Sequence, residues 1–216
     1  MMHEDWAAAR AAHARGDYAT ESRIYRMLAD QGDAQAQDNL GVMYENGWGV
    51  AKSYPEAVKW FRLAAEQGNA NAQNNLGVMY ETGLGVPTNH DEAVKWYRLA
   101  AEEGNANAQH NLANCYESGQ GMTQDYAEAV YWYRKAATQR HPMAQANLGV
   151  MYEYGHGVPQ DLAEAHKWFS LSVAGFPASE AKNRGIAMRN RDQLAERMTP
   201  DEIAEAQRRA RAWKPA

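Results

Sequence analysis

Apolar and polar residues follow one another along this chain in a pattern that repeats every 36 residues. A leucine and a tryptophan mark the pattern most clearly, since each recurs four times in register, at Leu40, Leu76, Leu112 and Leu148 and at Trp60, Trp96, Trp132 and Trp168. A fixed period of this length is typical of proteins whose repeats stack and bury a continuous core. The pattern therefore predicts one continuous solenoid, although 216 residues could also form two globular domains.

The first half of each repeat predicts a helix with one apolar face. In the second copy Ala72, Leu76 and Tyr80 are spaced four residues apart, so their side chains share one side of a helix. A glycine pair then ends the pattern in every copy. Its first member, Gly83 here, is placed to end the helix in the left-handed conformation, and its second member, Gly85, permits a further tight turn.

The second half of each repeat predicts another helix with a defined start. A residue that can cap a helix N-terminus stands three positions before a glutamate, in the pairs Ser53 and Glu56, Asn89 and Glu92, Asp125 and Glu128, and Asp161 and Glu164. This spacing predicts a reciprocal capping box in all four copies. Within the second copy, the helix is expected to bury Ala93, Trp96, Tyr97 and Ala100.

The repeats divide the chain into three parts. Four copies occupy residues 34–69, 70–105, 106–141 and 142–175, although Arg140 replaces the glycine that ends the earlier copies. Residues 1–33 predict a degenerate N-terminal capping helix pair, and residues 176–216 predict a C-terminal capping helix pair, because repeat arrays usually end in atypical units. The fold is predicted to be all-α, with about twelve helices and no strands.

The residues shared by the copies resemble a known family. The pattern A-x-A-Q-x-x-L-G-x-x-Y-x-x-G-x-G-V, followed by A-x-x-W-Y-x-x-A-A-x-x-G, is similar to the Sel-1-like repeat, a relative of the tetratricopeptide repeat. The resemblance covers residues 34–175 and implies a right-handed α/α superhelix that scaffolds protein complexes. One branch of that family staples its repeats with disulfides, but the single cysteine here, Cys115, separates this chain from it.

Composition narrows the choice of partner and compartment. The formal net charge of -5 argues against nucleic acid, which binds basic surfaces. The sequence contains no run of 18 apolar residues, so no membrane-spanning helix is predicted. The first residues, MMHEDWAAARAAHARGDY, lack the apolar core of a signal peptide, so the chain as it stands is expected to be cytoplasmic. A periplasmic or secreted location is the alternative if a signal peptide has been removed.

The sequence contains no motif for catalysis, a metal or a cofactor. The seven histidines form neither H-E-x-x-H nor a zinc-ligand spacing, and there is no G-x-S-x-G motif. The glycine pairs follow helices rather than strands, so they do not resemble phosphate-binding loops. Cys115 stands where the other copies have methionine and is predicted to be a small buried apolar residue. We therefore expect a protein that is not an enzyme.

Function is expected to lie on a surface. In the tetratricopeptide fold that the chain resembles, the first helix of each pair lines a concave groove. Transferring that register predicts partner-binding positions on the first helices, namely Asp38, Asn39, Glu45, Asn71, Asn74, Asn75, Val78, Glu81, Thr82, His110, Asn111, Asn114, Glu117, Asn147, Glu153 and Tyr154. These positions lie opposite the apolar stripe of each helix.

Two ladders stand out among these positions. The asparagines Asn39, Asn75, Asn111 and Asn147 could pair with the backbone of an extended peptide, since a carboxamide both donates and accepts. The glutamates Glu45, Glu81, Glu117 and Glu153 would favour a basic partner. The alternative is that the asparagines only bond the next repeat and the glutamates are merely solvated.

The leading hypothesis is a scaffold or adaptor that binds a protein or an extended peptide in this groove, with a monomer as the favoured state. One alternative is an envelope-associated glycan-binding protein or hydrolase. Another is a structural piece that stacks end to end. The C-terminal cap has nine basic and six acidic side chains, so it could dock an acidic partner or the acidic groove of a second copy, or it could simply be solvated.

Overall fold

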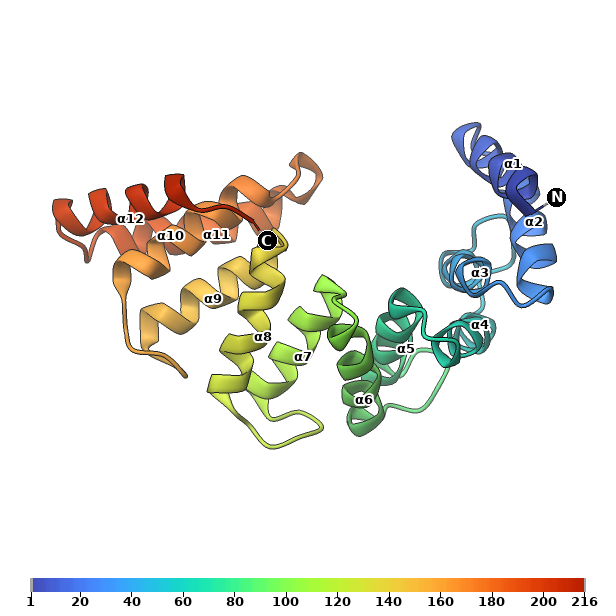
Figure 1. Ribbon diagram of the computed structural model, residues 1–216, viewed down its shortest axis with the longest axis horizontal. Coiled ribbons are helices and arrows are strands. Elements are labelled where there is room, and N and C mark those ends of the chain that lie inside the picture. Colours follow the sequence, from blue (N-terminus) through green and yellow to red (C-terminus); the bar gives the residue numbers. More distant parts are fainter. Residues whose placement is uncertain (1, 216) are drawn as a thin grey trace. The chain divides into compact units, whose positions relative to one another are not determined.

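The computed structural model describes residues 2–215, and it describes side chains from Glu4 onward. This part of the chain forms twelve α-helices and one short 3-10 helix, and it contains no strand (Figure 1). The prediction of an all-helical fold is confirmed. The chain divides into two compact units, residues 1–103 (unit 1) and 104–216 (unit 2).

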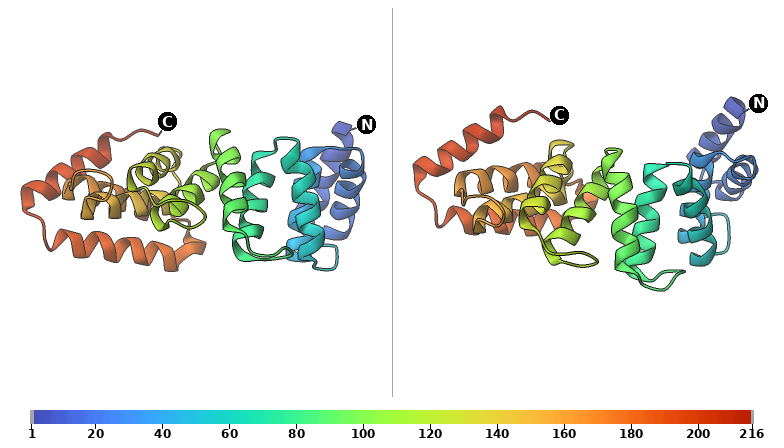
Figure 2. Two further views of the ribbon diagram at one scale, coloured as in Figure 1. Left: turned by 90° about the horizontal axis from the view of Figure 1, so that it is seen from below. Right: turned by 60° about the horizontal axis from the view of Figure 1, so that its bottom comes forward.

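Unit 1 is a run of antiparallel helix pairs in which each helix packs against the next along the chain. Figure 2 shows these helices, coloured blue to green, side by side. The first helices of the pairs are α1 (Met2–Ala14), α3 (Ala34–Asn46) and α5 (Ala70–Thr82). The second helices are α2 (Tyr18–Asp30), α4 (Tyr54–Glu66) and α6 (His90–Glu102).

Unit 2 begins with the same arrangement and ends differently. Its helices are α7 (Ala106–Ser118), α8 (Tyr126–Thr138), α9 (Pro142–Tyr154), α10 (Leu162–Gly175), α11 (Ala181–Ala195) and α12 (Pro200–Ala212), with the 3-10 helix η1 (Ala178–Glu180) before α11. Helices α7 to α10 pack in consecutive order, whereas α11 and α12 each pack against α10. The last two helices therefore hold the end of the array from two sides.

The core of each repeat is a leucine of the first helix and an aromatic ring of the second. The four leucines are fully buried, as are the rings at one position of the second helix, Phe61, Tyr97, Tyr133 and Phe169. Glycine at the contact lets helix and ring approach closely, because a Cβ on Gly77 would lie 2.6 Å from the Tyr97 ring. Trp96 is only half-buried, so its predicted place in the core is wrong in part, while Trp60, Trp132 and Trp168 are buried.

The glycine pairs end the first helices as predicted. Gly83 follows α5 with a φ of 73°, and its amide bonds the Met79 carbonyl. Gly85 is needed for a second reason, since a Cβ there would lie 2.5 Å from the backbone carbonyl carbon of Tyr54 in the preceding repeat. At the end of α8, Arg140 takes the left-handed conformation with a φ of 66°, where the earlier copies have glycine.

The predicted capping boxes form only in part. The side chains of Ser53, Asn89, Asp125 and Asp161 all accept a hydrogen bond from the backbone amide three residues later. Within the described residues, the reciprocal bond that completes a box is found at Thr199 and Glu202 instead. In three copies the glutamate pairs with a lysine one helical turn on, as Glu164 does with Lys167 at 2.7 Å. Two opposite charges at this spacing attract each other, so in these copies the ion pair competes with the reciprocal bond of the cap.

Neighbouring repeats are joined by polar contacts that recur with the period. The guanidinium of Arg62 on α4 donates to the Tyr80 hydroxyl on α5 at 2.5 Å, and Arg134 donates to Tyr152 in unit 2 at 2.7 Å. A buried glutamine near the start of α3, α5 and α9 bonds the end of the preceding helix, as Gln73 does with the Ala65 carbonyl. These bonds satisfy groups that burial would otherwise leave unpaired.

Candidate functional site

The first-helix face, formed by α1, α3 and α5 in unit 1 and by α7, α9 and α11 in unit 2, carries the predicted partner-binding residues. Asn71, Thr82 and Tyr154 are exposed there. Most of the remaining positions are half-buried, namely Asn39, Glu45, Asn75, Val78, Glu81, His110, Asn111, Asn114, Glu117 and Asn147. A partner could reach these side chains only at their tips.

Three predicted positions are buried, which corrects their placement on an open surface. Asp38 and Asn74 are 4% and 8% exposed, because this side of the helix faces the next repeat rather than solvent. Glu153 is buried for another reason, since Arg197 at the end of α11 covers it and donates to its carboxylate at 2.5 Å. These three side chains do not offer a free surface to a partner.

Two members of the asparagine ladder bond across repeats. Asn75 donates to the carboxylate of Asp38 at 3.0 Å. In unit 2, Asn147 donates to the Asn114 carbonyl oxygen at 3.2 Å and lies 3.1 Å from the Tyr133 hydroxyl. This arrangement favours the alternative in which these two amides hold neighbouring repeats together.

The four glutamates of the ladder differ in the groups that they bond. Tyr97 donates to Glu81 at 2.7 Å and Tyr133 donates to Glu117 at 2.5 Å, each within one repeat. The second helix that follows Glu45 has Phe61 in place of the tyrosine, so no hydroxyl is available there. Burial raises the pKa of Glu45, and the positive charge of Lys52 offsets this effect in part. Glu45 is therefore the carboxylate of the ladder that is least satisfied by its own chain.

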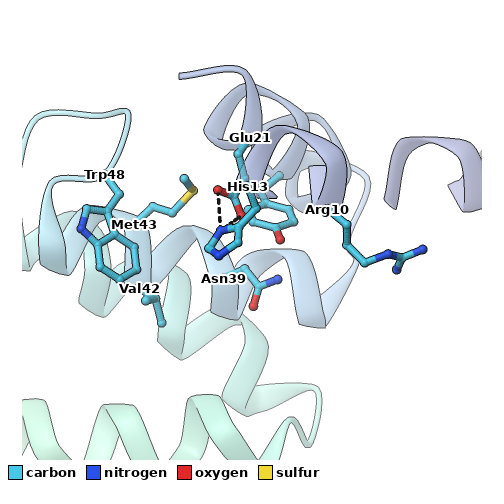
Figure 3. A pocket seen from close by; sticks show the side chains of 8 residues that line it. Arg10, His13, Glu21, Asn39, Val42, Met43 and Trp48 are labelled. Carbon is cyan, nitrogen blue, oxygen red and sulfur yellow. Dashed lines mark hydrogen bonds and ion pairs between the residues drawn. The ribbon is translucent and has the colours of Figure 1, made fainter. Parts of the chain in front are cut away.

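A pocket of about 340 Å³ opens on the first-helix face of unit 1 (Figure 3). Three helices and one loop surround it, and the lining side chains are Arg10, His13, Glu21, Tyr25, Asn39, Val42, Met43 and Trp48. Trp48 stands between the two glycines of the first copy and stacks on Tyr18, with 5.7 Å between ring centroids. That stacking holds an aromatic wall beside the aliphatic side chains of Val42 and Met43, while the guanidinium of Arg10 points away from the cavity (Figure 3).

A carboxylate lies at the base of this pocket. Glu21 is only 5% exposed, and its position in α2 corresponds to Ala57, Ala93, Ala129 and Ala165 in the later copies. The His13 ring nitrogen Nδ1 lies 3.1 Å from the carboxylate, which compensates for the burial of charge. Burial and the negative charge of Glu21 raise the pKa of Tyr25 to about 12. The pocket thus combines apolar walls with a few fixed polar groups, as ligand sites usually do.

The prediction from sequence found Asn39 but missed most of the pocket. Val42 and Trp48 in the walls, and Arg10, His13 and Glu21 beside them, are not among the predicted binding residues. One signal was available, because Glu21 replaces an alanine that every later copy retains. A second was Trp48, a large aromatic residue between two glycines.

The equivalent face of unit 2 is occupied by its own polar side chains. The His110 ring stacks on the His141 ring with 4.8 Å between centroids and lies 3.4 Å from the Asn147 amide. A cavity of about 90 Å³ remains between α9 and α11, lined in part by Asn147, Val150 and Ile186. The space left for a partner's side chain is much smaller than in unit 1.

The basic side chains of the C-terminal cap partly neutralise acids of the last repeat. Arg209 on α12 donates to Asp161 at 2.8 Å and to Glu164 at 3.3 Å, and it also pairs with Glu205. The hydrogen bond from Arg209 lowers the pKa of Asp161 despite its partial burial. These contacts hold α12 against the start of α10, which gives this arginine a structural role.

The described residues offer no metal-binding cluster and no membrane-spanning helix, and they bury Cys115. Among the side chains that the structure describes, Glu4 to Pro215, no three histidines, cysteines, aspartates or glutamates gather in a way that could hold a metal ion. None of the helices in the same range is both long and apolar enough to cross a membrane. The Cys115 side chain is buried, so the prediction of a small buried residue is confirmed.

The chain is similar to known repeat proteins in sequence and in fold. The family described as Sel1 repeat matches residues 34–69, 70–105, 106–141 and 142–174. A Sel1 repeat protein from Oxalobacter formigenes is 30% identical over 96% of this chain and 82% of its own, with a TM-score of 0.80. The antigen c5321 of uropathogenic Escherichia coli, which displays an SLR fold, is also 30% identical over 89% of this chain, with a TM-score of 0.57, and the match spans 48% of that protein.

More distant structures share the fold alone. The immunity protein Pa5087 from Pseudomonas aeruginosa is 18% identical over 87% of this chain and 82% of its own, with a TM-score of 0.53. None of the curated proteins matches the chain.

Proposed function

Because the chain belongs to the Sel1 repeat family, whose members generally mediate protein–protein interactions, we propose that it is a non-catalytic adaptor that binds an extended segment of a partner protein. The partner segment lies on the first-helix face of unit 1 and inserts one side chain into the pocket beside Trp48. The pocket carries this proposal, since it is larger than the cavity between α9 and α11 and has both apolar walls and polar groups.

The lining residues suggest how a segment would be held. Val42, Met43 and Trp48 would bury the apolar part of the inserted side chain, and burial of apolar area contributes about 25 cal/mol per Å². Asn39 can donate to and accept from the backbone that passes the pocket mouth. Glu45 lies on the same helix, and a basic residue of the partner would relieve its partial burial as a charge.

The acidic positions also bear on how a partner approaches. Unit 1 carries Glu45 and Glu81 on this face, and the whole chain is negatively charged. Opposite charges raise the rate of encounter more than they raise the affinity. A basic segment is therefore proposed to associate faster at low ionic strength, with an affinity that depends mainly on the anchoring side chain.

A matched pair of substitutions tests the location of the site. Val42→Glu places a charge in the wall of the pocket, whereas Val150→Glu makes the same change at the equivalent position of unit 2. Both valines are half-buried, so both variants are first checked for retained helicity and melting temperature. The wild-type chain, used as bait in an extract of its source, identifies a partner whose affinity is then measured by calorimetry.

The proposal expects Val42→Glu to weaken that affinity at least about tenfold, equivalent to about 1.4 kcal/mol, and Val150→Glu to leave it within a factor of two or so. Equal affinities of Val42→Glu and wild type, in a folded variant, would place the partner elsewhere. Loss of binding in Val150→Glu alone would move the site to unit 2.

A further inference from the structure

A row of exposed apolar side chains crosses the second helices of unit 1. Met27 on α2, Leu63 on α4 and Leu99 on α6 are 41%, 39% and 45% exposed. They occupy one position of the repeat, 36 residues apart. We call these three residues the apolar row. Helix α2 also contributes Glu21 and Tyr25 to the pocket, but none of the three residues of the apolar row lines it.

The apolar row is not needed by the repeat itself. A single exposed leucine is ordinary on a protein surface, so exposure alone would mean little. The same position of α8, in unit 2, is occupied by Lys135, which is exposed in a helix that is otherwise packed in the same way. The repeat therefore folds with a charged residue at this position. The exposure of three apolar residues on successive second helices of unit 1 requires an explanation other than packing within the repeat.

Two rows of opposite charge accompany the apolar row. Four residues before it on each helix stands an exposed basic residue, in the set Arg23, Lys59 and Lys95. Three residues after it stands an exposed acidic residue, in the set Asp30, Glu66 and Glu102. Side chains at these spacings lie on the same side of a helix, about one turn to either end of the apolar residue. Each second helix of unit 1 therefore presents the same order of basic, apolar and acidic groups.

We propose that this surface binds the same surface of a second copy of the chain. A two-fold axis along the apolar row would place row against row and would bring the basic row of each copy opposite the acidic row of the other. Such a self-complementary contact is the usual form of a symmetric dimer. The surface fits a second copy because it carries both the basic row and the acidic row that the contact requires.

The basic residues can exchange their present ion pairs for pairs with a second copy at little cost. Lys59 and Lys95 lie 3.7 Å and 2.5 Å from Glu56 and Glu92 in their own helices. Both pairs are largely exposed, and exposed ion pairs contribute little, typically about 0–1 kcal/mol. Unit 2 presents the pattern only in part, since the three positions are Tyr131, Lys135 and Thr138 on α8 and Lys167, Leu171 and Ala174 on α10, where Leu171 is half-buried and the acidic residue is missing. The proposed contact therefore belongs to unit 1.

Sedimentation equilibrium of the full chain at about 1–200 µM tests the proposal directly, since dimers of micromolar affinity populate in this range. The wild type is expected to shift from monomer to dimer, and Leu63→Glu is expected to raise the dissociation constant at least about tenfold. Tyr131→Glu is the control, because Tyr131 is a similarly exposed apolar residue on α8. A wild type that stays monomeric throughout overturns the proposal, as does an equal effect of the two variants.

A charge exchange tests the predicted geometry. One triple variant changes Arg23, Lys59 and Lys95 to Glu, and a second changes Asp30, Glu66 and Glu102 to Lys. Each is expected to be monomeric alone, because like charges then face each other, and an equimolar mixture is expected to form a heterodimer. Triple variants that dimerise separately, or a mixture that remains monomeric while the wild type dimerises, would overturn the pairing of rows. All the altered residues are exposed, and circular dichroism confirms that each variant is folded.

Discussion

The first-helix face of unit 1 opens into a pocket, whereas the same face of unit 2 is crossed by hydrogen bonds among its own side chains. Both units bury a leucine and an aromatic ring in every repeat, with glycine at their contact in all copies but the third, which has Ala113. In unit 1 the lining includes Val42 and Trp48. In unit 2 the corresponding positions are Asn114 and Gln120 in the third copy and Val150 and His156 in the fourth.

The residues of the repeat's core stay nearly the same in the two units, whereas the side chains on the first-helix face differ. Asn114 accepts a hydrogen bond from Asn147, and its carbonyl oxygen lies 2.6 Å from the Tyr133 hydroxyl, which draws side chains across the face. Val42 cannot make such bonds, and the adjacent aromatic position is Phe61, which lacks a hydroxyl. A few substitutions outside the core thus decide whether a repeat offers a cavity or fills it.

The largest effect tests the shared core. Phe61→Ala in unit 1 and Phe169→Ala in unit 2 each remove a fully buried ring, and each should lower the free energy of unfolding by about 3–5 kcal/mol. Urea denaturation followed by circular dichroism measures the loss. Equal losses are expected if the two units share one core design. A loss below about 1 kcal/mol in either variant would show that this ring does not hold its unit together.

A smaller effect tests the burial of Asp38 in unit 1. Burial raises the pKa of Asp38 to about 6, although hydrogen bonds from Asn75 and Gln35 lower it. The folded protein then holds a proton that the unfolded chain releases near pH 4, so stability should fall as the pH rises from about 4 to 6. Asp38→Asn places the residue of the second copy, Asn74, at this position. It should stabilise the protein by about 1–3 kcal/mol at pH 7.

Denaturation curves at several pH values check this prediction. The variant and the wild type should converge below about pH 3, where Asp38 carries its proton in both states. A variant that is less stable than the wild type at pH 7 would show that the Asp38 carboxylate is favourable where it lies.

The corresponding pH test in unit 2 concerns His141. Its Nδ1 atom accepts from the Ala144 amide at 3.1 Å and so caps α9, which requires a neutral ring. Burial lowers the pKa of His141. The unfolded chain therefore takes up a proton more readily, and stability should fall as the pH drops below about 6.5.

His141→Asn keeps the cap, since Asn69 and Asn105 cap α5 and α7 from the same position. The variant should match the wild type at pH 7 and exceed it by about 1 kcal/mol at pH 5, the usual value of a cap. Thermal melting at the two pH values measures this. An unchanged difference between pH 7 and pH 5 would mean that His141 does not titrate with unfolding.

The smallest effect concerns the corner after α8. Arg140 adopts a φ of 66°, where Gly32, Gly68 and Gly104 have φ values of 92°, 86° and 89°. Left-handed backbone costs a residue with a side chain roughly 1 kcal/mol, so Arg140→Gly should stabilise unit 2 by about 0.5–1 kcal/mol. The same denaturation assay resolves this change, and Gly68→Arg should have the opposite sign. Destabilisation by Arg140→Gly would indicate that the arginine side chain contributes more than the strain costs.

The sequence predicted the helices well and the surface poorly. Helix ends follow from local features, such as the left-handed turn at Gly83, and the apolar period places Leu76 and Ala72 in the core. The exposure of Asp38 could not be read in this way. Asn75 donates to it from the next repeat, 37 residues along the chain, and a helical period carries no information about that neighbour.

The sequence by itself determined that the chain is a stack of helix pairs, because the 36-residue period, the glycine ends and the N-terminal caps act within one repeat. Only the tertiary structure decided which polar side chains remain available. Glu21 lies in a pocket because α1, α2 and α3 meet around it. Met27, Leu63 and Leu99 form a row because successive second helices stay in register. Local interactions along the chain define a helix, but the contacts between helices determine its accessible surface.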